Sequence, residues 1–224
     1  MNKTEESAKE ENIRFKILIL GDSLVGKTSC ILRFCDDQFR EDTILTVASD
    51  IKTKFIKRND KNIYLEIWDI AGEERFKALE KLFYKAKDGI ILIYAINKKS
   101  SFTGIKERLD SIRKFTDIKK FEILVIGNKI DLPKEEREVD EEMINAFKEK
   151  EKLEIIECSA KENINVNEAF ISLIDKMIEL GLGKRTSFCE DDDEDNEKCK
   201  RLRLDNSNKR NMHRPGCFGG KKWI

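Results

Sequence analysis

The segment Ile13-Arg14-Phe15-Lys16-Ile17-Leu18-Ile19-Leu20-Gly21-Asp22-Ser23-Leu24-Val25-Gly26-Lys27-Thr28 decides the fold of this chain. Residues 13–20 form a short apolar run of the kind that makes a buried strand. Residues 21–28 match the pattern GxxxxGKS/T, whose glycines allow backbone N–H groups to curl around phosphates. The helix that begins here adds the positive end of its dipole. The pattern therefore predicts a nucleotide-binding loop.

Two side chains of this loop have predicted roles. Lys27 is expected to reach the β- and γ-phosphates, and the hydroxyl of Thr28 is expected to bind Mg²⁺. A chance match in a chain of 224 residues has a probability on the order of 1%. The residues predicted to bind the nucleotide through this loop are Ser23, Leu24, Val25, Gly26, Lys27, Thr28 and Ser29.

The rest of the body alternates between two periodicities. Further apolar runs typical of strands lie at 51–57, 63–68, 90–96, 121–127 and 153–157. Helix-length segments separate most of them, and the clearest, 166–180, has one apolar face and a glycine stop at Gly181 and Gly183. This alternation predicts an α/β three-layer sandwich with a six-stranded, mostly parallel sheet and about five helices. The short link at 59–62 predicts a hairpin, and hence one antiparallel edge strand.

Three further motifs come directly after predicted strands. They are Trp68-Asp69-Ile70-Ala71-Gly72, Asn128-Lys129-Ile130-Asp131 and Ser159-Ala160-Lys161. In open α/β sheets ligands bind outside the carboxyl ends of the strands. The three motifs and the phosphate loop are therefore predicted to converge on one site.

Asp131 is predicted to choose the base. A carboxylate accepts two hydrogen bonds, and guanine offers two donors on one edge, its N1–H and its 2-amino group. Adenine presents an acceptor there and would be repelled. Asn128 is expected to brace the loop, the stem of Lys129 to cover a face of the base, and the backbone N–H of Ala160 to donate to the guanine carbonyl. The predicted base-binding residues are Asn128, Lys129, Asp131, Ser159, Ala160 and Lys161.

At this point the chain resembles a Ras-superfamily small GTPase, and within it the Rab family. The resemblance covers about residues 13–181. The sequence segments that support the resemblance are Phe15-Lys16-Ile17-Leu18-Ile19-Leu20-Gly21-Asp22-Ser23, Ile67-Trp68-Asp69, Glu74-Arg75-Phe76 and Asn163-Ile164-Asn165-Val166-Asn167-Glu168-Ala169-Phe170. It implies that Phe39 packs against the guanine and that Asp69 holds Mg²⁺ through water. It also implies that Thr46 binds both Mg²⁺ and the γ-phosphate.

The resemblance further implies an enzyme that hydrolyses GTP to GDP through in-line attack of water. Its implied catalytic residues are Lys27, Thr46, Gly72 and Glu73, and its implied Mg²⁺ ligands are Thr28, Thr46 and Asp69. Rab proteins alternate between GDP and GTP forms and recruit effectors in vesicle traffic. Effectors, an exchange factor and a GTPase-activating protein are therefore expected at the switch regions, 39–51 and 69–84.

Several residues depart from the family pattern. Glu73 stands where the family usually has the Gln that orients the attacking water, so we expect altered hydrolysis of undetermined sign, unless Glu73 points to solvent. Leu24 occupies a position that is often glycine. Its bulk either shields the phosphates and hinders a partner's arginine, or packs outward. Ala48 and Ser49-Asp50-Ile51 replace the usual residues in the first switch region, 39–51, so the identity of partners stays open. Ala95 stands where Rab proteins usually have Asp.

Composition limits the remaining possibilities. The charges cancel, 44 basic against 44 acidic residues, which does not favour binding of nucleic acid. No apolar run is long enough to span a bilayer, and six cysteines without a CxxC pair suggest reduced thiols. We expect a flexible N-terminus (1–12), a GTPase domain (13–181) and a disordered, charged tail (182–224) in a monomeric, cytoplasmic protein.

The tail leaves membrane attachment open. The chain ends in Lys221-Lys222-Trp223-Ile224, without a prenylation motif. Cys217 could be acylated, the bases of 198–222 could give peripheral contact with the cytosolic face of endomembranes, or the tail could stay in solution. Two rival functions also stay open. One is a GTP-binding interaction protein with negligible turnover, and the other is a nuclear transport factor similar to Ran.

Overall fold

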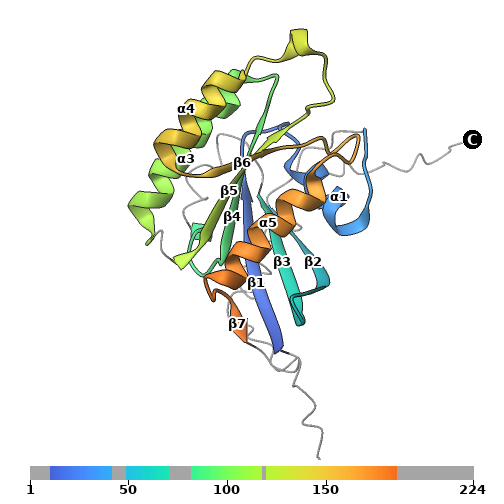
Figure 1. Ribbon diagram of the computed structural model, residues 1–224, viewed down its shortest axis with the longest axis vertical. Coiled ribbons are helices and arrows are strands. Elements are labelled where there is room, and N and C mark those ends of the chain that lie inside the picture. The colour runs from blue at the N-terminus through green and yellow to red at the C-terminus, as the bar shows by residue number, and fades with distance from the viewer. Residues whose placement is uncertain (1–10, 42–48, 71–81, 118–119, 186–224) are drawn as a thin grey trace, which may run out of the picture. The chain divides into compact units, whose positions relative to one another are not determined.

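The computed structural model of the chain describes residues 11–41, 49–70, 82–117 and 120–185. Within these residues one sheet has the strand order β2-β3-β1-β4-β5-β6, and β7 also pairs with β1 (Figure 1). Its strands are β1 (Glu11–Leu20), β2 (Ser49–Arg58), β3 (Lys61–Ile70), β4 (Gly89–Ala95), β5 (Glu122–Asn128), β6 (Glu154–Glu157) and β7 (Lys184–Arg185). Only the β2–β3 and β1–β7 pairs described are antiparallel. The predicted fold, a mostly parallel sheet with an antiparallel edge strand, is confirmed.

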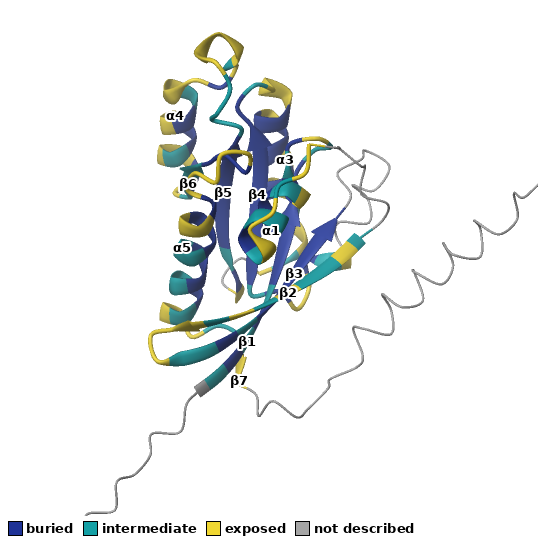
Figure 2. Cartoon of the chain, turned by 90° about the vertical axis from the view of Figure 1, so that its right-hand side faces the viewer, coloured by how far each residue is buried: buried dark blue, intermediate teal, exposed yellow. Residues whose placement is uncertain are grey.

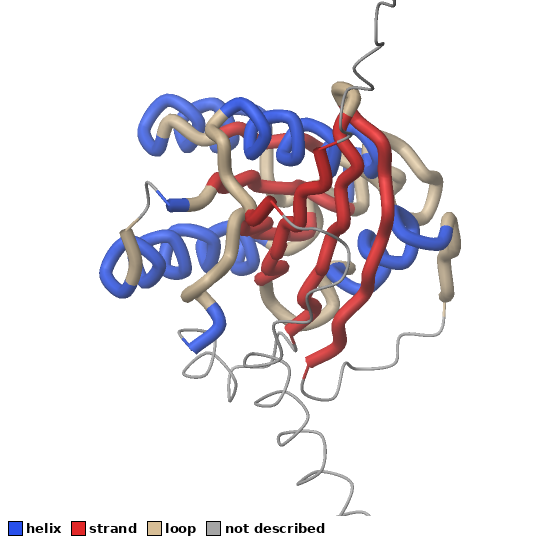
Figure 3. Tube along the Cα trace, turned by 90° about the horizontal axis from the view of Figure 1, so that it is seen from below, coloured by secondary structure: helices blue, strands red, loops and turns tan. Residues whose placement is uncertain are grey.

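Helices lie on both faces of this sheet (Figure 3). The described ranges hold the α-helices α1 (Lys27–Asp36), α3 (Lys99–Phe115), α4 (Glu141–Glu151) and α5 (Val166–Glu179), and the short 3₁₀ helix η3 (Lys134–Glu136). The helices α1 and α5 share one face, and α3 and α4 share the other (Figure 1). This arrangement gives the predicted three layers, with four α-helices in the described ranges where the sequence predicts about five in the whole chain.

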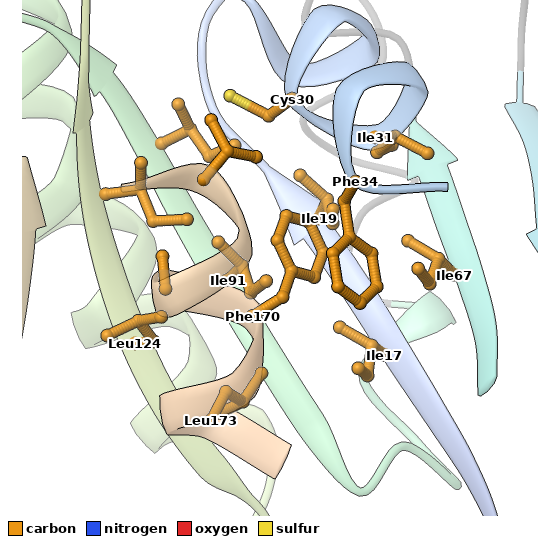
Figure 4. Packing of buried hydrophobic residues seen from close by; sticks show 14 of the residues in the cluster. Ile17, Ile19, Cys30, Ile31, Phe34, Ile67, Ile91, Leu124, Phe170 and Leu173 are labelled. Atoms are coloured by element: carbon orange, nitrogen blue, oxygen red, sulfur yellow. The ribbon is translucent and has the colours of Figure 1, made fainter. Parts of the chain in front are cut away.

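The core lies on both sides of the central strands (Figure 2). Below α1 and α5 it contains the odd-numbered residues 13–19 of β1, and Phe34 stacks on Phe170 with ring centroids 4.1 Å apart (Figure 4). On the other side Phe102 of α3 contacts Tyr94 of β4 and Phe147 of α4, with centroids 4.9 Å and 5.4 Å apart. These contacts fix the strands whose carboxyl ends carry the predicted site.

The link between β2 and β3 is a two-residue hairpin. Arg58 pairs with Lys61, and the two residues between them, Asn59 and Asp60, have φ angles of 50° and 57°. Two successive left-handed residues are the signature of a type I′ turn, whose twist matches that of antiparallel strands. The predicted hairpin is confirmed.

The end of α5 follows the expected glycine stop. Gly181 has a φ of 65°, and its N–H donates to the carbonyl of Ile178, while the N–H of Leu182 donates to the carbonyl of Met177 at 2.9 Å. This pair of contacts is a Schellman motif, in which a left-handed glycine satisfies the last free carbonyls of a helix. The predicted helix, 166–180, is therefore confirmed to within one residue.

The sheet has seven strands in the described ranges, where the sequence predicts six, and the additional strand is β7. In β7, Lys184 and Arg185 pair with Arg14 and Ile13 of β1. The strand lies in the segment 182–224 that the sequence assigns to the tail, and neither residue carries an apolar strand signal. Just before it, Gly183 has a φ of 88°, and a Cβ there would lie 2.6 Å from the ring of Phe15, so this close approach requires glycine.

Asp88 also holds β7 beside β1. Its carboxylate accepts a hydrogen bond from the backbone N–H of Lys16 at 2.7 Å and another from the N–H of Gly183. Burial nevertheless raises the pKa of Asp88 above its ordinary value. Across the described ranges no helix has the length and apolar character to cross a membrane. Residues 1–10 and the tail from residue 186 lie outside the described residues, whereas Glu11 and Asn12, which the sequence assigns to the flexible N-terminus, belong to β1.

Candidate nucleotide-binding site

The phosphate loop joins β1 to α1 and contains two glycines that no other residue could replace without a shift. A Cβ at Gly21 would lie 2.2 Å from the carbonyl oxygen of Ile93. Gly26 has a φ of 94°, and a Cβ there would lie 2.1 Å from the amide nitrogen of Asn128. The pattern glycines are therefore needed both for the turn and for the close approach of neighbouring strands.

Lys27 is held at this loop. Its side chain is buried, with 6% of its surface exposed, and Nζ donates to the carbonyl oxygens of Gly21 at 3.1 Å and Asp22 at 2.8 Å. An ammonium group is compact and strongly hydrated, so its burial requires such partners. The charge therefore sits where the sequence predicts the phosphates.

Thr28 and Asp69, two of the three predicted Mg²⁺ ligands, lie in contact. The hydroxyl of Thr28 donates to Oδ2 of Asp69 at 2.5 Å, and Asp69 is 3% exposed. Its Oδ1 is buried and has no hydrogen-bond partner among the described atoms. Burial raises the pKa of Asp69, although the Thr28 hydrogen bond and the Lys27 charge oppose the shift.

This donor set fits a magnesium ion. A hydroxyl and a carboxylate are hard oxygen ligands, and Mg²⁺ in nucleotide sites is held by few protein groups together with phosphates and water. In the described part of the chain no cluster of three or more His, Cys, Asp or Glu side chains could hold a metal by itself. The residues present therefore suit an ion that arrives with a phosphate ligand.

Asn128 joins the phosphate loop to the base loop. It is 2% exposed, and its amide nitrogen donates to the carbonyl of Val25 at 2.9 Å. Its amide oxygen accepts the backbone N–H of Ala160 at 3.1 Å and lies 3.7 Å from the sulfur of Cys158. Asn128 thus braces three segments that are far apart in sequence. Donation by Ala160 N–H to a guanine carbonyl stays a prediction, since that N–H here bonds Asn128.

Asp131 is oriented by the neighbouring motif. The hydroxyl of Ser159 donates to Oδ1 of Asp131 at 2.6 Å and accepts the N–H of Glu162 at 3.0 Å. Ser159 is fully buried, so this contact is fixed, and it engages one of the two carboxylate oxygens. Lys129 lies between the two anchor residues with a φ of 75°, and burial lowers its pKa. Lys161 is exposed at the end of the same loop.

Arg33 is a residue of the candidate site that the sequence patterns do not reveal. From the last turn of α1 its Nε donates to the carbonyl of Ala160, and a terminal nitrogen donates to the carbonyl of Lys161, both at 3.0 Å. A third nitrogen contacts the Asp37 carboxylate at 3.1 Å. The guanidinium therefore ties the end of α1 to the base loop. A basic residue near a helix C-terminus was the only sequence signal, and it does not reveal a partner over a hundred residues away.

Of the other predicted residues, Leu24 and Phe39 are described by the structure, whereas others lie outside the described ranges. Leu24 has a φ of 66° and is 57% exposed, so its side chain stands outward from the loop. Phe39 is partly buried and packs against the core below α1, and its contact with guanine stays a prediction. Thr46, Gly72 and Glu73 lie outside the described residues, as do most of switch regions 39–51 and 69–84.

The helix α1 contains two free cysteines, Cys30 and Cys35. Cys30 is fully buried, and its hydrogen bond to Cys158 and its burial raise its pKa well above the ordinary value. Burial also raises the pKa of the half-buried Cys35 to about 11. Both shifts disfavour the thiolate, which is the reactive form.

The chain is similar to known proteins over most of its length. A model of the Ras family matches residues 16–179. Human Ras-related protein Rab-3A is 39% identical over 175 residues, which cover 78% of this chain and 79% of the relative. The GTP-binding protein YPT1 of Saccharomyces cerevisiae is 35% identical over 186 residues, 81% and 89% of the two chains. The GTP-binding protein YPTM1 of Zea mays is 39% identical over 161 residues, 71% and 76% of the two chains.

Proposed function

This chain belongs to the Ras family as a Rab-like small GTPase, and we propose that it binds GTP and GDP with Mg²⁺, hydrolyses GTP and acts as a switch in vesicle traffic. The observation that supports this best is the position of Asn128. Its amide contacts Val25 of the phosphate loop and Ala160 of the base loop, so one side chain sets the spacing between the two ends of a nucleotide.

Each end of the site has a role in binding. The backbone amides of the phosphate loop and the Lys27 ammonium bind the phosphates, and release of Lys27 from the carbonyls of Gly21 and Asp22 frees its hydrogen atoms for them. Asp131, held by Ser159, accepts the two guanine donors. The base is thus selected at one end, while the charge is bound at the other.

In hydrolysis the residues of this chain would position the water and the γ-phosphate, and none of them would itself attack the phosphorus. Water attacks the γ-phosphorus in line, with Lys27 stabilising the charge on the phosphate oxygens and Gly72 and Glu73 at the attack face. Thr28, Thr46 and Asp69 would hold Mg²⁺, which when bound neutralises charge on the β- and γ-phosphate oxygens. The side chain of Glu73 can accept a hydrogen bond from water but cannot donate one to the phosphate.

The same contacts would make the switch. Thr46 and Gly72 bind only the γ-phosphate form, so its loss releases both switch regions. Effectors, an exchange factor and a GTPase-activating protein would therefore bind at 39–51 and 69–84. We further propose a monomer in the cytoplasm whose basic tail, 198–222, gives peripheral contact with endomembranes.

Nucleotide retention tests this function directly. The full chain, purified in the presence of Mg²⁺, should keep bound GDP or GTP through gel filtration and should not keep ADP or ATP. Replacement of Asp131 by Asn, which removes one acceptor and adds a donor, should weaken guanine retention without improving that of adenine. A parent protein that retains no guanine nucleotide, or retains adenine equally well, would overturn the proposal.

Turnover needs a separate experiment. Phosphate release from preloaded GTP in a single turnover should differ between the parent and Glu73→Gln, since only Gln can both orient water and donate to the phosphate. Equal rates would show that Glu73 has no part in hydrolysis.

A second candidate function is a GTP-binding interaction protein with negligible turnover. Glu73 favours it, because a carboxylate cannot donate the hydrogen bond to the phosphate that the usual Gln can donate. Phosphate release measured with and without cell extract separates the two. Stimulation by extract supports the hydrolytic switch, whereas release that stays negligible in both supports the interaction protein.

A further inference from the structure

A buried charge pair joins α3 to the phosphate loop. A terminal nitrogen of Arg108, in the second half of α3, lies 2.8 Å from Oδ1 of Asp22. The Arg108 side chain is 3% exposed and that of Asp22 is 15% exposed. The two residues are 86 positions apart in sequence. This largely buried ion pair connects α3 to the loop that is predicted to bind the phosphates.

The local packing of α3 is built around this contact. Gly104 lies one turn before Arg108, and a Cβ there would be 3.5 Å and 3.9 Å from the two carboxylate oxygens of Asp22. It would also lie 3.2 Å from Arg108. Ser101, another turn back, is fully buried and bonds the end of β4 through the N–H of Ala95. Residues spaced by three and four positions share one helix face, so this face of α3 is the one turned to the site.

The charge of Asp22 would otherwise oppose phosphate binding. Asp22 directly follows Gly21, and its own carbonyl oxygen accepts a hydrogen bond from Lys27. A carboxylate in a loop that binds a polyphosphate repels the ligand unless a cation compensates it, and the effect is larger where water is excluded. Arg108 supplies that cation, and its planar head group directs the carboxylate toward α3.

We propose that Arg108 is a positioning residue for the nucleotide. Its guanidinium holds the Asp22 carboxylate against α3 and balances its charge, which leaves the loop amides and Lys27 to the phosphates. The proposal rests on the proposed guanine-nucleotide function. It adds α3, which the motifs do not include, to the elements that set nucleotide retention.

The test compares two arginine-to-methionine variants of the same helix. Arg108→Met keeps the apolar stem and removes the charge. Arg113→Met makes the same change at the end of α3, where the arginine pairs with Glu151 of α4 at 2.6 Å. Release of fluorescent GDP from the full chain with Mg²⁺ should be about tenfold faster in Arg108→Met than in the parent, a change of the size seen when an interaction between two contacting residues is lost. In Arg113→Met the release rate should stay within about twofold of the parent rate.

Rescue separates charge balance from mere folding. Adding Asp22→Asn to Arg108→Met removes the uncompensated acid and should return GDP release to within about threefold of the parent rate. Arg108→Lys, which keeps the charge, should also stay within about threefold, and this variant decides the question if Arg108→Met does not fold. Melting temperatures of the nucleotide-free variants monitor the fold.

Two results would overturn the inference. One is parental release from Arg108→Met. The other is a fast release that neither Asp22→Asn nor Arg108→Lys corrects. A parent that holds no GDP is a different outcome, because it rejects the proposed function itself.

Discussion

At the scale of single residues, Asp69 is a buried carboxylate at the proposed cation site, and its burial destabilises the ligand-free protein. Its Oδ1 lacks a described partner, and burial raises its pKa. The folded protein therefore binds a proton at Asp69 more readily than the unfolded chain does. The resulting stabilisation is present below the unfolded pKa of about 3.9 and is lost as the pH rises through the higher folded pKa.

Asp69→Asn removes this loss. At neutral pH without nucleotide or Mg²⁺, the variant should have a free energy of unfolding about 1 kcal/mol higher than the parent, as measured in urea. The advantage should shrink on acidification. The same variant should lose the Mg²⁺-dependent slowing of GDP release, since an amide is a weaker ligand than a carboxylate. A variant that is less stable than the parent at pH 7 would contradict this account.

Asp175 provides a control of opposite sign. Hydrogen bonds from Arg58, at 2.8 Å and 2.7 Å, lower the pKa of Asp175. Its stabilisation is therefore present above the unfolded pKa and is lost as the pH falls through the folded pKa. Asp175→Asn should be less stable than the parent at pH 7, with a difference that disappears in acid.

The motif residues were predictable because each motif is local. The motifs that contain Lys27, Thr28, Asn128 and Asp131 lie at the carboxyl ends of strands, so the order of strands and loops was enough to bring them to one edge. Arg33 and Arg108 were not predictable, since each acts on a partner 86 or more positions away. The sequence gives no register between a helix and such a loop.

At the scale of elements, Arg33 couples the end of α1 to the base loop. Arg33→Met should release GDP about tenfold faster, because two carbonyls lose a charged donor. Arg58→Met is a suitable control, since it breaks a surface ion pair between β2 and α5. Dissociation of fluorescent GDP measures both variants. Similar rates for Arg33→Met and the parent would remove Arg33 from the site.

The β2–β3 hairpin contains an avoidable strain. Asp60 adopts a φ of 57°, which glycine adopts more easily, and Asn-Gly is the preferred pair in this turn. Asp60→Gly should raise the free energy of unfolding by about 0.5–1 kcal/mol. Asp140→Gly makes the same change at the N-cap of α4, where φ is −83° and the side chain accepts the N–H of Met143. That control should not stabilise the protein. Urea titrations of both variants decide the matter.

At the scale of the whole molecule, nucleotide binding and folding should be linked. A ligand that binds only the folded state at a thousand times its Kd adds about 4 kcal/mol, or roughly 10 °C in Tm for a domain of this size. GDP with Mg²⁺ should produce such a rise and ADP with Mg²⁺ should not. Thermal unfolding followed by circular dichroism measures both, and equal shifts would contradict guanine selection.

The layers and the mostly parallel sheet also followed from the sequence, because alternating apolar runs and helices permit few arrangements. The strand β7 did not, since Lys184 and Arg185 have no apolar pattern and are held by β1, Asp88 and the turn at Gly183. Backbone pairing, rather than side-chain burial, makes this strand.

Pairing of β7 beside Ile13 and Arg14 has a practical consequence for anyone who trims the chain. On the edge of β1 that faces β4, the strand β4 pairs with β1 only from Ile17 onward. On the same edge β7 pairs with the earlier residues Ile13 and Arg14. A fragment ending at residue 181 would leave those backbone groups open as a template for another molecule. Light scattering should show that such a fragment aggregates as its concentration rises, whereas a fragment that ends after Arg185 should not aggregate.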